Sequence, residues 1–202
     1  WQLLTDIGPS LGSVLTDAGY RTGYIGKWHL YGGRRDRPIP RGPHRHGFDD
    51  VFLSNNCATE FGPEAAFYWD SGEKKKFGEW EQFGQARQAA NFLDQCRADE
   101  PFALFVSWHP PHNHRTNKEE SLGYQAPEPY SSRYSPDSID LRPDQSDDYR
   151  HRQITRGYFG LVDSLDDCFA MIENKLEEKG LADDTIVVYT SDHGDLLRYV
   201  NG

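Results

Sequence analysis

The spacing of apolar residues along the chain predicts three helices and four strands. Apolar positions recur every three or four residues in three segments: 9–18, 82–97 and 147–179. Apolar or β-branched runs typical of strands occupy four more segments: 20–25, 48–53, 102–108 and 184–190. The runs at 102–108 and 184–190 lack polar alternation, so we expect both strands to be buried on both faces.

The order of these elements predicts the fold class. Helices and strands alternate along the chain, which favours an α/β fold with a mainly parallel sheet flanked by helices. Ligands bind beyond the carboxyl ends of the strands in such sheets. Three polar motifs follow predicted strands at this edge: Gly26-Lys-Trp-His29, His109-Pro-Pro-His-Asn-His114 and Ser191-Asp-His-Gly-Asp195. We therefore expect the three motifs to share one site.

Composition narrows the choice of partners. The 202 residues carry a formal net charge of -10, which argues against nucleic-acid binding. A hydrophobic content of 36% and a mean hydropathy of -0.81 are low for a compact domain and suggest a partial one. No apolar run approaches the roughly 18 residues of a membrane span, so none is predicted. The three cysteines are an odd number and indicate no disulfide framework.

The first motif suits an oxyanion. In an extended or tightly turned segment Lys27 and His29 point the same way, and a compact ammonium can contact a tetrahedral anion as a point charge. These residues alone are equally typical of a turn with a buried Trp28 and two solvated cations.

The other two motifs also allow more than one interpretation. The diproline before His112 stiffens the backbone, and an imidazole can act as a general acid near neutral pH. A surface polyproline turn has the same sequence pattern. Adjacent Asp192 and His193 after a strand can reach one metal ion, and Gly194 permits the sharp exit. An Asx turn after a strand would look the same.

Taken together, these stretches resemble the sulfatases, which belong to the alkaline phosphatase superfamily. The segment Ala18–Leu30 resembles the family's lysine and histidine signature, and Thr190–Asp195 resembles its metal-binding strand end. The resemblance extends from about residue 9 to 195 and implies a sulfuric ester hydrolase. It implies catalytic roles for Lys27, His29 and His112, substrate binding by Lys27, His112 and His114, and metal binding by Asp192 and His193.

The same resemblance implies cofactors, and it shows which sequence motifs of the family are missing here. Sulfatases use a divalent metal, here Ca²⁺ by preference with Mn²⁺ or Mg²⁺ as alternatives, and a formylglycine made from Cys or Ser. The Cys/Ser-x-Pro-Ser/Ala-Arg pattern that yields this nucleophile does not occur in the sequence, and no Asp-Asp pair follows an N-terminal apolar strand. We therefore expect residues 1–202 to be a partial sulfatase catalytic domain, lacking N-terminal and C-terminal parts and inactive alone.

Several functions remain open at this level. The implied substrate is a small-molecule or carbohydrate sulfate ester, and the family favours a periplasmic or extracellular location. One alternative is a phosphonate monoester or phosphodiester hydrolase of the same superfamily. Another is a non-catalytic module that binds anions or a metal. The sequence does not indicate an oligomeric state.

Overall fold

The chain folds into one mixed sheet with helices on both sides. The computed structural model describes residues 4, 8–113, 124–143, 145 and 147–197. Its helices and strands are α1 (Leu11–Asp17), β1 (Arg21–Lys27), β2 (Val51–Asn55), β3 (Phe67–Asp70), β4 (Glu73–Lys76), α2 (Glu81–Asp94), β5 (Phe102–Ser107) and α3 (Tyr149–Glu178). Short 3-10 turns are η1 (Pro43–Arg45), η2 (Tyr130–Ser132), η3 (Pro136–Ser138) and η4 (Ala182–Asp184). All three predicted helices are confirmed.

The sheet has the strand order β4-β3-β2-β1-β5. Strand β1 runs parallel to β2 on one side and to β5 on the other, so the predicted α/β fold with a parallel centre is confirmed. Strands β3 and β4 are antiparallel and were not predicted, which makes the sheet mixed. They form a hairpin whose turn residues Ser71 and Gly72 both have positive φ, as a two-residue hairpin turn requires.

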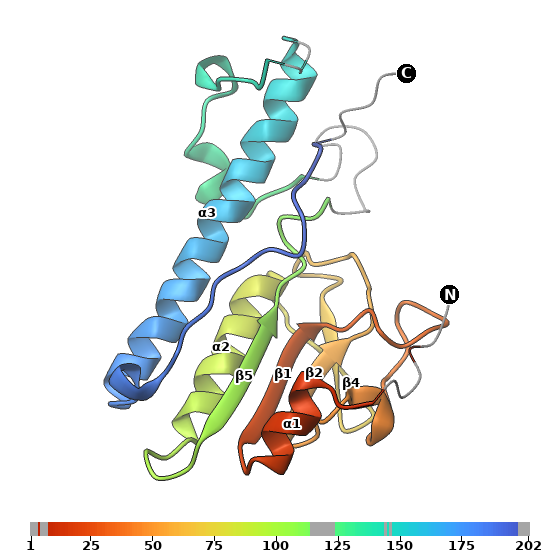
Figure 1. The fold of residues 1–202 in the computed structure, drawn as a ribbon. Coiled ribbons are helices and arrows are strands. Elements are labelled where there is room, and N and C mark those ends of the chain that lie inside the picture. Colours follow the sequence, from red (N-terminus) through yellow and green to blue (C-terminus); the bar gives the residue numbers. More distant parts are fainter. Residues whose placement is uncertain (1–3, 5–7, 114–123, 144, 146, 198–202) are drawn as a thin grey trace.

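Helices α1 and α2 cover opposite faces of the sheet, and α3 packs on α2 (Figure 1). Neighbouring residues of β1 point to opposite faces of the sheet, because side chains alternate along a strand. Gly23 faces Phe92 of α2, whereas Tyr24 joins an aromatic cluster with Phe48, which lies against Gly12 of α1. This two-sided burial fixes the register of β1 and the position of its carboxyl end.

Helix α3 is the long amphipathic helix that the sequence predicts. Its apolar stripe is buried at Ile154, Leu161, Leu165 and Leu176, and its N-terminus is capped by the side chain of Asp148. None of the helices in the described part of the chain is both long and apolar enough to cross a membrane.

The predicted strand at 184–190 is wrong. After η4 the chain is irregular and runs alongside α3 as a separate segment (Figure 1). Ile186 is 92% exposed and Val188 is 76% exposed, so this β-branched run is not part of a core. The local pattern favours extended backbone, but a strand also needs a hydrogen-bonded neighbour, and the described residues provide none. The prediction that the strand at 102–108 is buried on both faces is also wrong. Strand β5 is half-buried because it lies at the sheet edge, where β1 is its one strand neighbour among the described residues.

Candidate functional site

The end of β1 presents Lys27 and His29 through a constrained turn. Gly26 has φ 113°, and a Cβ atom there would lie 2.1 Å from the carbonyl oxygen of Ser107 on β5, so only glycine fits. Lys27 is the last residue of the strand, and the next residue, Trp28, is buried. His29 adopts a left-handed φ of 59°, which is unusual outside glycine and often marks a functional turn.

Two asparagines at the end of β2 hold this turn in place. The backbone nitrogen of Trp28 donates to the carbonyl oxygen of Asn55 at 3.0 Å. The side chain of Asn56 accepts from the nitrogen of Tyr31 at 3.3 Å and donates to the carbonyl oxygens of Tyr31 and Arg34. Neither asparagine was selected from the sequence, although a polar pair directly after an apolar strand is a pattern that could have indicated them.

The second motif begins where β5 ends. His109 is buried, and its Nδ1 lies 2.7 Å from Oε2 of Glu81. Its carbonyl oxygen accepts from the nitrogen of His112 at 3.0 Å, across a cis Pro110–Pro111 bond. The imidazole of His112 is exposed, and its Nδ1 contacts the carbonyl oxygen of Asn113 at 2.9 Å. His114 lies outside the described residues, so its substrate-binding role stays a prediction.

The third motif lies on the irregular segment. The side chains of Asp192 and His193 are 77% and 73% exposed, and Nε2 of His193 is 3.5 Å from Oδ2 of Asp192. Asp195 accepts a hydrogen bond from Tyr124 at 2.8 Å. Within the described residues, no three His, Cys, Asp or Glu side chains gather into a group that could hold a metal ion. Among the described residues, Asp192 and His193 therefore supply two adjacent metal ligands without a third.

One groove nevertheless joins the motifs. Its volume is about 1310 Å³, and it extends along β5 and the segment after η4. The residues that sequence reasoning selected and that border this groove are Lys27, His29, His112, Asp192 and His193. Lys27, His29 and His112 share this location because β1 and β5 are parallel and their carboxyl ends meet at the same edge. Asp192 and His193 reach the groove from the irregular segment after η4. Their catalytic and metal-binding roles remain predictions.

Positively charged groups gather around His29 in this groove, although the chain as a whole is acidic. Partial burial, followed by the charges of Lys27, Arg35, His109 and His112, lowers the pKa of His29. These neighbours are all cationic groups or imidazoles, which is the environment that an anion requires. Arg35 was not selected from the sequence, because nothing in its loop indicated that it would lie near His29.

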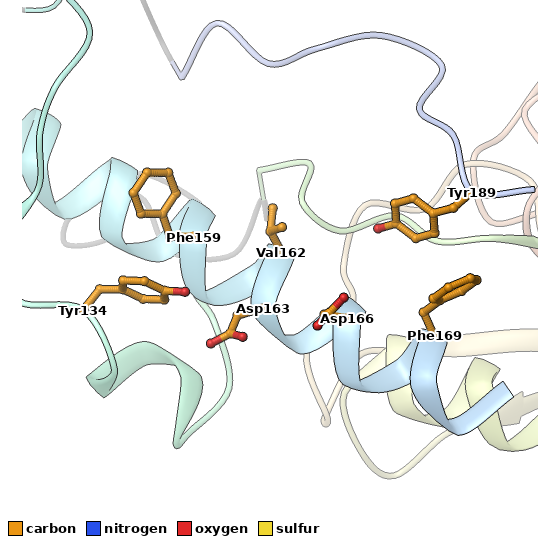
Figure 2. A pocket seen from close by; sticks show the side chains of 7 residues that line it. All are labelled: Tyr134, Phe159, Val162, Asp163, Asp166, Phe169 and Tyr189. Atoms are coloured by element: carbon orange, nitrogen blue, oxygen red, sulfur yellow. The ribbon is translucent and has the colours of Figure 1, made fainter. Parts of the chain in front are cut away.

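A second hollow does not suit an anion. It has a volume of about 550 Å³ and lies on the exposed side of α3 (Figure 2). Its lining residues are Tyr134, Phe159, Val162, Asp163, Asp166, Phe169 and Tyr189. No basic side chain lines it, so it offers a sulfate group no cation, whereas Lys27 lines the larger groove. The groove with Lys27 is therefore the candidate site.

Comparisons with known proteins agree with this arrangement. The sequence model named Sulfatase matches residues 3–201. The chain is 30% identical over 190 residues to an ulvan-active sulfatase of Formosa agariphila, with 93% of this chain and 35% of that protein covered. It is 25% identical over 224 residues to an endo-4-O-sulfatase of Bacteroides thetaiotaomicron, with 96% and 41% covered.

Solved structures show the same relationship. The crystal structure of yidJ from Bacteroides fragilis superimposes with a TM-score of 0.75 at 28% identity, over 95% of this chain and 45% of that one. The chain thus spans less than half the length of the relatives named here. A family match along nearly its whole length and a shared fold lead to one conclusion: the chain belongs to the sulfatase family.

Proposed function

We propose that the protein containing this chain hydrolyses sulfate esters and that the chain supplies the part of the site that holds the sulfate group. The observation that carries the proposal is the meeting of Lys27, His29 and His112 in one groove at the carboxyl edge of the parallel strands. Sulfatases generally use a divalent metal and a formylglycine nucleophile. In-line displacement at such a centre depends mainly on positioning and charge neutralisation.

Each of the three side chains has a role that its surroundings support. The ammonium of Lys27 can contact a sulfate oxygen, because β1 ends at this residue and directs it to the groove. The lowered pKa of His29 favours its neutral imidazole, which can both donate and accept a hydrogen bond. The imidazole of His112 is exposed, and in this proposal it protonates the departing alcohol oxygen.

The proposed metal ligands are Asp192 and His193. A carboxylate favours Ca²⁺, whereas an imidazole beside it also admits Mn²⁺, and Mg²⁺ remains a further alternative. Since the described residues provide two donors and Ca²⁺ takes roughly 6–8 ligands, these residues alone do not complete a metal site. When bound, the ion would neutralise charge on the sulfate oxygens.

The proposed substrate is a sulfate ester of a carbohydrate or a smaller alcohol. Two relatives are named for activity on ulvan and for 4-O-sulfate removal, which supports an ester on an oxygen atom. The net charge of -10 would repel an anionic substrate at long range, so local cations such as Lys27 must provide its attraction.

A substrate panel on the parent protein tests the proposal. We expect turnover of aryl and carbohydrate sulfates, with much slower turnover of a phosphonate monoester and a phosphodiester. Lys27→Ala should lower sulfate ester hydrolysis about a hundredfold or more, because it removes a charge aimed at the reacting group. Lys76→Ala, on the exposed β4 strand, is the matched control and should have no effect.

Two results would reject the proposal. Faster turnover of the phosphorus substrates would make the protein a phosphonate or phosphodiester hydrolase. Absence of turnover in the metal-supplemented parent protein, together with retained sulfate binding, would make it a non-catalytic anion-binding module.

A further inference from the structure

A buried hydrogen-bonded chain lies beneath the candidate site. Glu81, the first residue of α2, accepts from Nδ2 of Asn55 at 3.0 Å through Oε1 and contacts Nδ1 of His109 at 2.7 Å through Oε2. The side chains of Glu81 and His109 are each 1% exposed. The three residues come from the end of β2, the start of α2 and the end of β5. Three separate elements therefore fix the orientation of one imidazole.

The hydrogen bonds define which nitrogen of His109 carries a proton. An ionised carboxylate only accepts, so both Asn55 and His109 donate to Glu81, and the proton of the pair lies on Nδ1. The N-terminus of the 14-residue helix α2 favours a negative charge at Glu81, its first residue. In a doubly protonated imidazole the second nitrogen, Nε2, is also a donor.

This second nitrogen is the unusual feature. Nε2 of His109 is buried and has no hydrogen-bond partner among the described residues. Leaving a buried polar group unpaired is costly, and such groups usually meet an ordered water, an ion or a ligand. The contact with Glu81 anchors His109 through Nδ1 and would be enough for a purely structural role. It leaves Nε2 without a partner among the described residues.

The position of His109 indicates what would satisfy Nε2. His109 is one of the residues that line the groove, together with Lys27, His29 and His112. Its carbonyl oxygen accepts from the nitrogen of His112, so the two histidines belong to one turn. The charge of His109 acts on His29, which confirms that the imidazoles are near one another. Any anion bound among these groups would lie close to His109.

We propose that His109, oriented by Glu81, is a further anion-binding residue of this site. Its Nε2–H donates to an oxygen of the bound sulfate group, either directly or through one ordered water. The inference rests on the proposed function, because it takes a sulfate oxygen as the acceptor. It adds a histidine for which the sequence suggested no role. It also explains the burial of Glu81 at the start of α2, since this carboxylate fixes the orientation of the imidazole.

Nuclear magnetic resonance of the chain with ¹⁵N-labelled histidine tests the proposal without turnover. Inorganic sulfate is the probe, and chloride at equal ionic strength is the control. We expect the Nε2 signal of His109 to shift on addition of sulfate. Glu81→Gln should abolish this response because it disturbs the orientation of the imidazole, whereas Glu79→Gln, which removes a carboxylate that pairs with Arg87 on the surface, should preserve it.

His109→Asn separates anchoring from anion binding. The asparagine amide can donate to Glu81 in place of Nδ1–H, but it has no group at the position of Nε2. We expect thermal unfolding close to that of the unchanged chain and sulfate affinity lower by about tenfold or more, as loss of a hydrogen bond to a charged group implies.

Two outcomes overturn the proposal. Unchanged sulfate affinity in His109→Asn would show that Nε2 makes no contact with the anion. Absence of any sulfate-induced shift at His109 would do the same. Neither result bears on ester hydrolysis, which the substrate panel decides separately.

Discussion

Two polar motifs of this chain follow similar apolar runs but have very different surroundings. Lys27 follows a run in which Ile25 is 0% exposed and pairs with Leu53 on one side and Val106 on the other. Asp192 follows a run in which Ile186 is 92% exposed, with no strand beside it among the described residues. The first motif is held by a sheet, whereas the second lies on an irregular segment.

The difference shows that an apolar run positions a motif only when neighbouring strands are present. At the end of β1, backbone pairing and the side chain of Asn56 fix the turn that carries His29. At 191–193 the carboxylate of Asp192 bonds only to its neighbour, His193, among the described contacts. The turn with Lys27 and His29 is therefore organised by the described fold, whereas the segment with the proposed metal ligands has few contacts among the described residues.

The largest expected effect comes from the close approach that shapes the turn with Lys27 and His29. Gly26→Ala would place a methyl group against the carbonyl oxygen of Ser107 and force alanine into positive φ. We expect a loss of about 3–5 kcal/mol in the free energy of unfolding, measured by urea denaturation. Gly19→Ala is the control, because Gly19 also has positive φ but no atom within 4 Å of the added Cβ. It should lose only about 1–2 kcal/mol, and equal losses in the two variants would show that the Ser107 contact is unimportant.

Much of the fold could be predicted from local patterns. The helix periodicity located α2 and α3, and apolar runs located β1, β2 and β5. The hairpin was missed because β4 is the polar sequence Glu-Lys-Lys-Lys, in which charged residues protect a sheet edge rather than fill a core. The strand at 184–190 was predicted wrongly because its residues favour a strand that only a neighbouring segment could complete.

The site residues that could be predicted were likewise those that lie in local sequence patterns. Lys27, His29 and His112 could be selected because each lies in a short motif. Glu81 and Arg35 could not, because their relation to the site depends on distant parts of the chain. Glu81 contacts His109 across 28 residues of sequence, and no local pattern indicates that contact.

A pair of matched truncations tests the comparison at the level of stability. Ile25→Ala should lower the free energy of unfolding by about 2–5 kcal/mol, because it opens a cavity in a fully buried position. Ile186→Ala should change it by less than about 0.5 kcal/mol, because the side chain is already in solvent. Chemical denaturation of the 202-residue chain measures both. A large loss in Ile186→Ala would mean that the segment is packed, and the contrast between the two motifs would disappear.

The smallest expected effect is the titration of His29, which reports on the turn at the end of β1 alone. Partial burial and then the nearby charges of Lys27, Arg35, His109 and His112 lower its pKa from the usual 6.5. As the pH falls through 6.5, the unfolded chain therefore takes up a proton before the folded chain does. His29 consequently makes the folded state less stable as the pH falls through this window, and it has no effect above it.

Histidine proton signals followed against pH measure this directly. The midpoint for His29 should lie below 6.5 and rise in Lys27→Gln, although burial, the larger cause, keeps it below the usual value. Added salt should raise it in the same direction by screening the cations, and Lys76→Gln should leave it unchanged. A midpoint that changes neither in Lys27→Gln nor with added salt would mean that the cations do not converge on His29. The charge argument for an anion site at the end of β1 would then fail, and the two motifs would differ only in the strands beside them.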